Sequence, residues 1–134
     1  MNPDDASEPV VSLRLERMEY QPGDELLGAF AVADVPARLR TLELSVLWYT
    51  EGKGDADLGV IHFEEWSDDT RPLQRGQPQA FTVWLPRTPQ SYDGVLIKIH
   101  WCARVRARWE GLSETLVEEP FTLGPGHCEG EAAS

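Results

Sequence analysis

Residues 95–109 read VLIKIHWCARVRARW, and this stretch decides the fold class. Positions of one parity are all apolar, whereas the other parity is largely polar or basic. The apolar set is Val95, Ile97, Ile99, Trp101, Ala103, Val105, Ala107 and Trp109. The other set is Leu96, Lys98, His100, Cys102, Arg104, Arg106 and Arg108. A period of two is typical of a β-strand. The stretch therefore predicts one long strand with its first face buried and its second face in water, Cys102 included.

Shorter segments on both sides of this stretch repeat the pattern, and helix signals are nearly absent. The expected strands cover residues 11–15, 26–32, 42–48, 58–66, 81–85 and 114–123, and both faces of residues 58–66 are partly apolar. Seven or so strands separated by turn-forming residues predict an all-β fold, a two-sheet antiparallel immunoglobulin-like sandwich. We assign it to residues 10–123. Residues 1–9 and 124–134 are polar, acidic or glycine-rich, and they are expected to be a disordered and a flexible tail.

Size and charge exclude several classes of function. The chain has 134 residues, enough for one domain, and a formal net charge of −11. A strongly acidic surface repels phosphate groups, so neither a nucleic acid nor a membrane surface is an expected partner. No run approaches the roughly 18 apolar residues of a membrane span, so membrane insertion is not expected. The first nine residues lack the features of a signal peptide, which predicts a cytoplasmic protein. The high share of arginine among the basic residues suggests a bacterial source.

Two motifs are more specific than the alternation. Residues 20–28 contain a Pro-Gly-acidic turn with a glycine four residues later, where a bend or close packing is expected. Residues 85–94 end one strand at a proline, cross over, and re-enter a sheet just before the long strand. Tyr92 is expected to pack under this crossover. The structural residues of the two motifs are Pro22, Gly23, Asp24, Gly28, Pro86, Pro89, Ser91, Tyr92, Gly94 and Trp101.

The two motifs resemble the amino-terminal lobe of the arrestin family in their order and spacing. The resemblance continues with Ile99-His100-Trp101 on the long strand and Pro120-Phe121 on the last one. The similarity extends to retromer-type and thioredoxin-interacting-type relatives and covers residues 10–123. It implies an arrestin-like sandwich and an adaptor or scaffold role without catalysis. The chain has one lobe where typical members have two. The first strand lacks a basic pair that would match the phosphate-sensing residues of visual-type arrestins, so phosphoreceptor binding is not carried over.

The basic row on the long strand is the candidate partner-binding site. Same-face neighbours on a strand stand about 7 Å apart, so the row could hold an acidic peptide or a phosphate. Alternatively, acids on neighbouring strands, such as Glu43, Glu64 or Glu118, neutralise it as cross-strand pairs. The row consists of Lys98, Arg104, Arg106 and Arg108.

Other candidate sites are weaker. His100 and Cys102 could bind a metal only if His62, His127 or Cys128 joined them, so no metal or other cofactor is expected. An acidic region could bind calcium or a basic partner, or could simply be solvated; it consists of Asp55, Asp57, Glu64, Glu65, Asp68 and Asp69. Trp84 alternates with the residues of its strand that are expected to face the core, so it should face outward. Trp66 could join Trp84 in stacking a sugar. No catalytic signature is present, so no catalytic residue is assigned.

The sequence thus predicts a non-enzymatic protein-interaction module whose partner is another protein. Main-chain pairing at a free strand edge is the expected mechanism, and a homodimer through such an edge is a variant of it. The alternative function is a small-ligand-binding sandwich for a carbohydrate or calcium.

Overall fold

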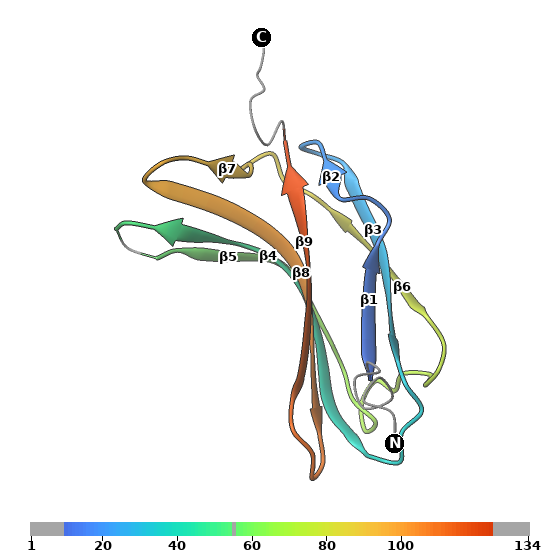
Figure 1. Ribbon diagram of the computed structural model, residues 1–134. Helices are drawn as coiled ribbons and strands as arrows, with labels where there is room; N and C mark the ends of the chain where they lie inside the picture. Colours follow the sequence, from blue (N-terminus) through green and yellow to red (C-terminus); the bar gives the residue numbers. More distant parts are fainter. Residues whose placement is uncertain (1–9, 55, 125–134) are drawn as a thin grey trace, which may run out of the picture.

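The computed structural model describes residues 10–54 and 56–124, so the predicted tail 1–9 and residues 125–134 of the other tail lie outside the described residues. Within the described residues the secondary structure is all strand (Figure 1). The strands are β1 (Val11–Leu15), β2 (Glu19–Tyr20), β3 (Glu25–Val32), β4 (Leu39–Gly52), β5 (Leu58–Trp66), β6 (Gln79–Trp84), β7 (Tyr92–Asp93), β8 (Ile97–Trp109) and β9 (Thr115–Leu123).

The strands form two layers. The small sheet has the order β1-β3-β6, and the large sheet has the order β2-β9-β8-β4-β5, with β7 added along β8. All described pairings are antiparallel except that of β2 with β9, which is parallel. The predicted two-sheet sandwich is confirmed, and the strand that residues 95–109 predicted is the centre of its larger sheet.

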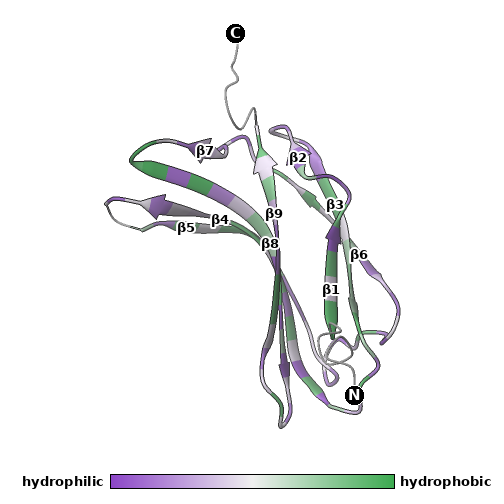
Figure 2. Cartoon of the chain, viewed as in Figure 1, coloured by the Kyte–Doolittle hydropathy of each residue, from purple (hydrophilic) through white to green (hydrophobic). Residues whose placement is uncertain are grey.

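The core lies between the two sheets and follows the period of two. Along β8 the apolar and polar residues alternate (Figure 2), and the inward set from Trp101 to Trp109 is buried. The small sheet contributes Leu26, Phe30, Phe81 and Val83, and the large sheet contributes Leu42, Leu44, Trp101 and Val105. Aromatic rings connect the layers, since Phe30 packs edge-on against Trp66 with ring centroids 5.1 Å apart. The hydrophobic burial of this interior is what holds the sandwich together.

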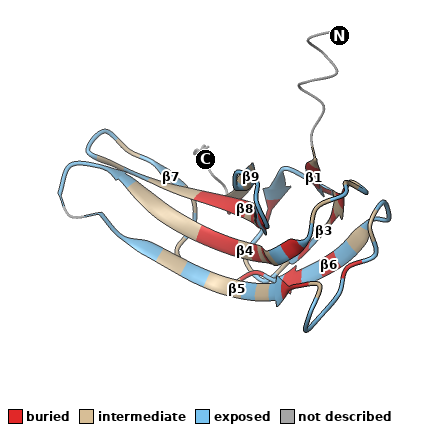
Figure 3. Ribbon diagram, turned by 90° about the horizontal axis from the view of Figure 1, so that it is seen from below, coloured by how far each residue is buried: buried red, intermediate tan, exposed pale blue. Residues whose placement is uncertain are grey.

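One end of the large sheet extends beyond the small one. In Figure 1 the upper ends of β4, β5 and β8 bend away from β1, β3 and β6, with β7 beside them. We call this region the arm and define it as residues 48–54, 56–61 and 92–100. No residue of the arm is buried, in contrast to the overlapped part of the same strands (Figure 3).

The Pro-Gly turn forms as predicted. Gly23 has a φ of 87°, the amide of Asp24 donates to the carbonyl of Gln21, and the amide of Gln21 donates to the Asp24 carboxylate at 2.8 Å. Gly28 lies opposite Phe81 on β6. A Cβ at Gly28 would lie 2.6 Å from the Phe81 ring and 2.8 Å from the carbonyl oxygen of Arg14. The glycine is therefore required by close packing.

The crossover between the sheets is also built as predicted, except for Tyr92. The Ser91 hydroxyl accepts from the amide of Leu123 at 2.9 Å, and the Ser91 amide donates to the Leu123 carbonyl. The Trp101 indole donates to the carbonyl of Pro89 at 2.8 Å. Tyr92 does not pack under the crossover, because it pairs with the exposed end of β8 and is 55% exposed.

Two further expectations about the long strand are wrong. Val95 and Leu96 precede β8 and form the tip of its hairpin with β7, so Val95 is fully exposed instead of buried. Cys102 is on the outer face but is only 3% exposed. Its registered neighbours on either side are Leu47 and Pro120, which shield it where the large sheet bends.

We predict that Gly28→Ala lowers the free energy of unfolding by about 1–3 kcal/mol, the usual cost of overpacking a core. Urea unfolding measures this change. Ala31→Ser, on the same strand but outside the core, is the control and should change stability by less than about 0.5 kcal/mol. An unchanged unfolding free energy in Gly28→Ala would show that Phe81 has room to move.

Candidate functional site

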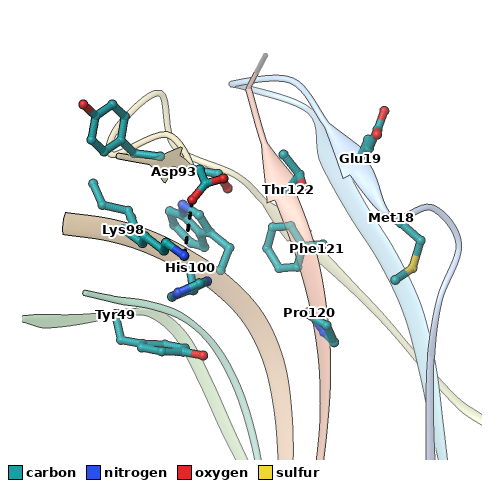
Figure 4. Close-up of a pocket in the computed structure, with 13 residues that line it drawn as sticks. Met18, Glu19, Tyr49, Asp93, Lys98, His100, Pro120, Phe121 and Thr122 are labelled. Atoms are coloured by element: carbon teal, nitrogen blue, oxygen red, sulfur yellow. Dashed lines mark ion pairs between the residues drawn. The ribbon is translucent and has the colours of Figure 1, made fainter. Parts of the chain in front are cut away.

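Each member of the predicted basic row has an acidic neighbour. Arg104 lies 2.6 Å from Glu118, and the Arg106 Nε lies 2.7 Å from Glu114, close enough for an ion pair although its N–H is not aligned for a hydrogen bond. Arg108 lies 3.9 Å from the same Glu114. Lys98 is separated from the arginines, on the arm, and pairs at 3.6 Å with Asp93 of β7 (Figure 4). An anionic partner would therefore have to compete with these neighbours.

His100 and Cys102 are not brought together with other ligands. The His100 ring stacks on Tyr49 with centroids 5.1 Å apart, and its Nε2 lies 2.7 Å from a Glu51 carboxylate oxygen. The described residues contain no group of three histidine, cysteine or acidic side chains that could hold a metal ion. His127 and Cys128, two of the predicted additional ligands, lie outside the described residues.

Most of the described acidic residues at the end of β5 and in the loop after it have structural partners. Asp68 accepts from the amide of Leu39 and pairs with Arg75, while Asp69 pairs with Arg38. Glu64 accepts hydrogen bonds from His62 and Arg71. Burial raises the pKa of Glu64, but these two hydrogen bonds outweigh it and hold that pKa below its ordinary value.

Glu65 differs from its neighbours. It is exposed, and within the described chain it forms no ion pair. It lies directly opposite Glu43 on β4, so two carboxylates are adjacent on one face. Asp55 lies outside the described residues. Within the described residues, the acidic region therefore leaves two carboxylates exposed and without an ion pair: Asp57, which accepts from the amide of Leu58, and Glu65, which lies beside Glu43.

Trp84 faces outward as its parity predicted, and it is 70% exposed on the outer face of the small sheet. Trp66 is buried, because it lies opposite Leu42 and packs against Phe30, and Arg71 covers its ring at 4.3 Å. The two tryptophans therefore do not form an exposed pair for a sugar.

A groove lies at the root of the arm, between β2, β7, β8 and β9 (Figure 4). It forms because β8 pairs with β9 up to Trp101 and with β7 at Lys98 and Ile99, which leaves His100 between two partner strands. Its volume is about 570 Å³. The apolar lining includes the exposed Met18 and Tyr92, the partly exposed Ile99, and the buried Trp101 and Phe121. The polar lining includes Glu19, Tyr49, Asp93, Lys98 and His100. The groove depends on strands that change partners, so no local pattern in the sequence indicated it.

The arm carries exposed apolar side chains on its outer face and at its tip. On β5, Leu58 and Val60 of the arm are 55% and 51% exposed, and Phe63, which follows the arm on the same strand, is 54% exposed. We call these three residues the β5 stripe. The register of β5 against β4 shifts between His62 and Val60, which makes Ile61 the extra residue of a β-bulge. This bulge explains why apolar residues occur at both odd and even positions of residues 58–66, although Leu58, Val60 and Phe63 lie on one face.

The combination of a small sheet, a longer sheet with an arm, and the crossover defines an arrestin-like β-sandwich. Among solved structures, the crystal structure of Spo0M, a sporulation control protein from Bacillus subtilis, is similar, with a TM-score of 0.58 and 18% sequence identity. The match covers 85% of this chain and 48% of the Spo0M chain, so this chain spans about half the length of that protein. At this identity the likeness is one of fold.

The other comparisons add no relative: no model of a known protein family matches the chain, and neither does any curated protein. Within the described residues, no helix has the length and apolar character needed to cross a membrane.

We predict that the Cys102 thiol is unreactive in the folded protein. Burial raises its pKa to about 11, which leaves about a hundredfold less thiolate at pH 8 than an ordinary cysteine has. Cys128→Ser leaves Cys102 as the single thiol, and a chromogenic disulfide reagent measures its rate of reaction in native buffer and in denaturant. Rapid reaction in native buffer would mean that the bend of the large sheet opens readily.

Proposed function

We propose that the chain is a non-enzymatic protein-interaction module, an adaptor or scaffold that recognises another protein through its arm. The observation that carries the proposal is a sheet region without a buried residue that presents apolar side chains on its outer face and at its tip. Monomeric proteins rarely leave contiguous apolar surface in water unless it binds something.

The geometry of the arm supports this proposal. A strand covered on both faces is usually apolar throughout, and a strand covered on one face alternates. On the arm, Trp48 and Ile99 continue the core face of β4 and β8, while Tyr49 and Leu58 lie on the opposite face. Tyr92, Val95 and Leu96 extend the apolar surface to the hairpin tip. A partner that covers the arm would bury this surface.

Two further observations agree with a role without catalysis. The two described histidines, His62 and His100, bind carboxylates, and neither forms a hydrogen bond with a serine or a cysteine. Spo0M, whose fold is similar, is named a sporulation control protein, which is a regulatory name. We place the protein in a bacterium, as its arginine content and the organism of Spo0M suggest.

Capture of a partner from a lysate of the producing organism tests the proposal. We expect one stoichiometric partner with the unaltered protein and its loss with Leu58→Ser/Val60→Ser, because these serines remove apolar surface from the arm. Leu112→Ser, at the exposed β8–β9 turn, is the matched control and should retain the partner. Quantitative mass spectrometry of the captured proteins measures the outcome.

A comparison with Arg104→Glu/Arg106→Glu locates the site. Loss of the partner in this variant alone would move the interaction to the basic row. Failure of the unaltered protein to retain any stoichiometric partner would contradict the proposed function.

The groove favours a second function, a small-ligand-binding sandwich. Its volume of about 570 Å³ is within the range of small-molecule sites, and it combines aromatic surface with a few polar groups. A carbohydrate would stack on such aromatic rings. Calcium is the other ligand class of this alternative, but the described residues offer it no group of three acidic side chains.

A thermal-shift screen with calcium and a set of glycans tests this second function. A ligand that binds only the folded state raises the melting temperature by several degrees. The groove is its site if Lys98→Ala and His100→Ala each reduce the shift. If no calcium salt or glycan changes the melting temperature, the alternative fails for these two ligand classes.

A further inference from the structure

We propose that β5 is a strand-addition site, and that its partner is an extended segment with apolar residues at alternate positions and a basic residue on the same face. This inference rests on the proposed function and names the class of partner and the mode of recognition. It follows from three features of β5: its edge position, its apolar stripe, and the charge at the end of that stripe.

The first feature is the edge. β5 is the last strand of the large sheet, and in the described chain it pairs only with β4. An edge strand presents main-chain N–H and C=O groups that an added strand can pair with. β5 is nine residues long, so its edge is longer than that of β1 or β6, the edge strands of the small sheet.

The second feature is the stripe. Leu58, Val60 and Phe63 point to one face, and the first two lie opposite Tyr49 and Leu47 on β4. Apolar side chains therefore continue from the edge inward on the outer face of the sheet, where Tyr49 is partly exposed and Leu47 is buried. A strand added to β5 would place every second side chain on this face, next to the stripe. Apolar residues at those positions would cover side chains that are now about half exposed.

The third feature is the charge at the end of the stripe. Glu65 and Glu43 are directly opposite each other, and like charges in that position are destabilising. Arg106, the residue opposite Glu43 on β8, is engaged by Glu114. A basic side chain of an added strand, placed opposite Glu65, would supply the missing cation. This requirement selects a basic partner and sets the register of the added segment.

The bulge at Ile61 limits which partners fit. A bulge disrupts regular pairing, so continuous main-chain hydrogen bonds are available on the stretch from His62 to Trp66. This stretch contains both Phe63 and Glu65. A second copy of the chain fits poorly, because its own acidic β5 would face Glu65 and each copy carries a net charge of −11. We therefore commit to a basic segment of another protein rather than to a homodimer.

A synthetic peptide tests the inference on the full chain. The probe is a fluorescent peptide of sequence Arg-Thr-Val-Thr-Val-Thr-Val-Thr-Arg, in which arginine and valine share one face of an extended strand. The matched probe has glutamate in place of both arginines. We expect the arginine peptide to bind at least about fivefold more tightly in fluorescence anisotropy, and the difference to shrink as salt is added.

Charge reversal gives the decisive comparison. Glu65→Lys should reverse the preference, so that the glutamate peptide binds more tightly than the arginine peptide. Phe63→Ser should weaken both peptides, while Leu112→Ser should change neither. Because Glu65 is exposed, its substitution should leave the fold intact, and the melting temperature checks this. Hydrogen exchange should show slower exchange of the β5 amides from His62 to Trp66 when the arginine peptide is bound.

Several outcomes would overturn the inference. They are absence of peptide binding, equal affinity for the two peptides, an unchanged preference in Glu65→Lys, and protection confined to β1 or β6. Sedimentation of the free protein as a dimer with protected β5 amides would assign the site to a second copy instead. If the peptides fail while capture of a partner still depends on Leu58 and Val60, strand addition is wrong and the proposed function stands.

Discussion

The pairing of β4 with β8 is the interaction on which the rest of the structure depends. It runs from Leu39 and Trp109 to Gly52 and Ile97, with one register shift between Leu39 and Thr41, so the same two strands stay paired through the sandwich and the arm. Below its middle, the small sheet covers one face and the inward residues are buried. Above its middle, the same two strands continue without cover (Figure 3). The arm therefore has its orientation fixed by the hydrogen bonds that also build the core.

The crossover between the sheets secures the root of the arm. The carbonyl of Leu85, at the end of the small sheet, accepts a hydrogen bond from the amide of Gly23. This bond connects the Pro-Gly turn to the start of the crossover. A few residues later, Ser91 exchanges two hydrogen bonds with Leu123, the last residue of β9. Trp101 then joins the crossover to the centre of β8. Because β7 and β9 are fixed by these bonds on either side of His100, the groove between them is a consequence of how the sheets are connected.

The sequence predicted those features that depend on local chemistry. The alternation of apolar and polar residues identified β8. The turn needs a positive φ, which Gly23 supplies. The position of Trp84, between residues that face the core, predicted that it faces outward. Features that depend on the overlap of the sheets were missed. The alternation continues through Val95 and Leu96, yet no second sheet covers them. Cys102 has the parity of a wet face but is shielded where the sheet bends. Periodicity identifies which side chains share a face, but it does not show what packs on that face, so neither the arm nor the groove could be predicted.

Ordering an arm that no second sheet covers costs conformational entropy, and this cost affects how the arm can bind a partner. Fixing the backbone of each residue opposes folding by roughly 1–2 kcal/mol, and on the arm no complete burial offsets it. The arm is ordered because β4 and β8 are already aligned in the core, so folding of the sandwich holds the arm in an extended form. A partner that binds there gains main-chain hydrogen bonds and apolar burial without having to order the arm, and preorganisation of this kind increases affinity. The bulge at Ile61 and the acidic pair at Glu65 then restrict the partners, since both disfavour nonspecific pairing of edges. We therefore expect β5 to discriminate between partners for two reasons: its main chain is already extended, and the bulge and the acidic pair limit which segments can bind.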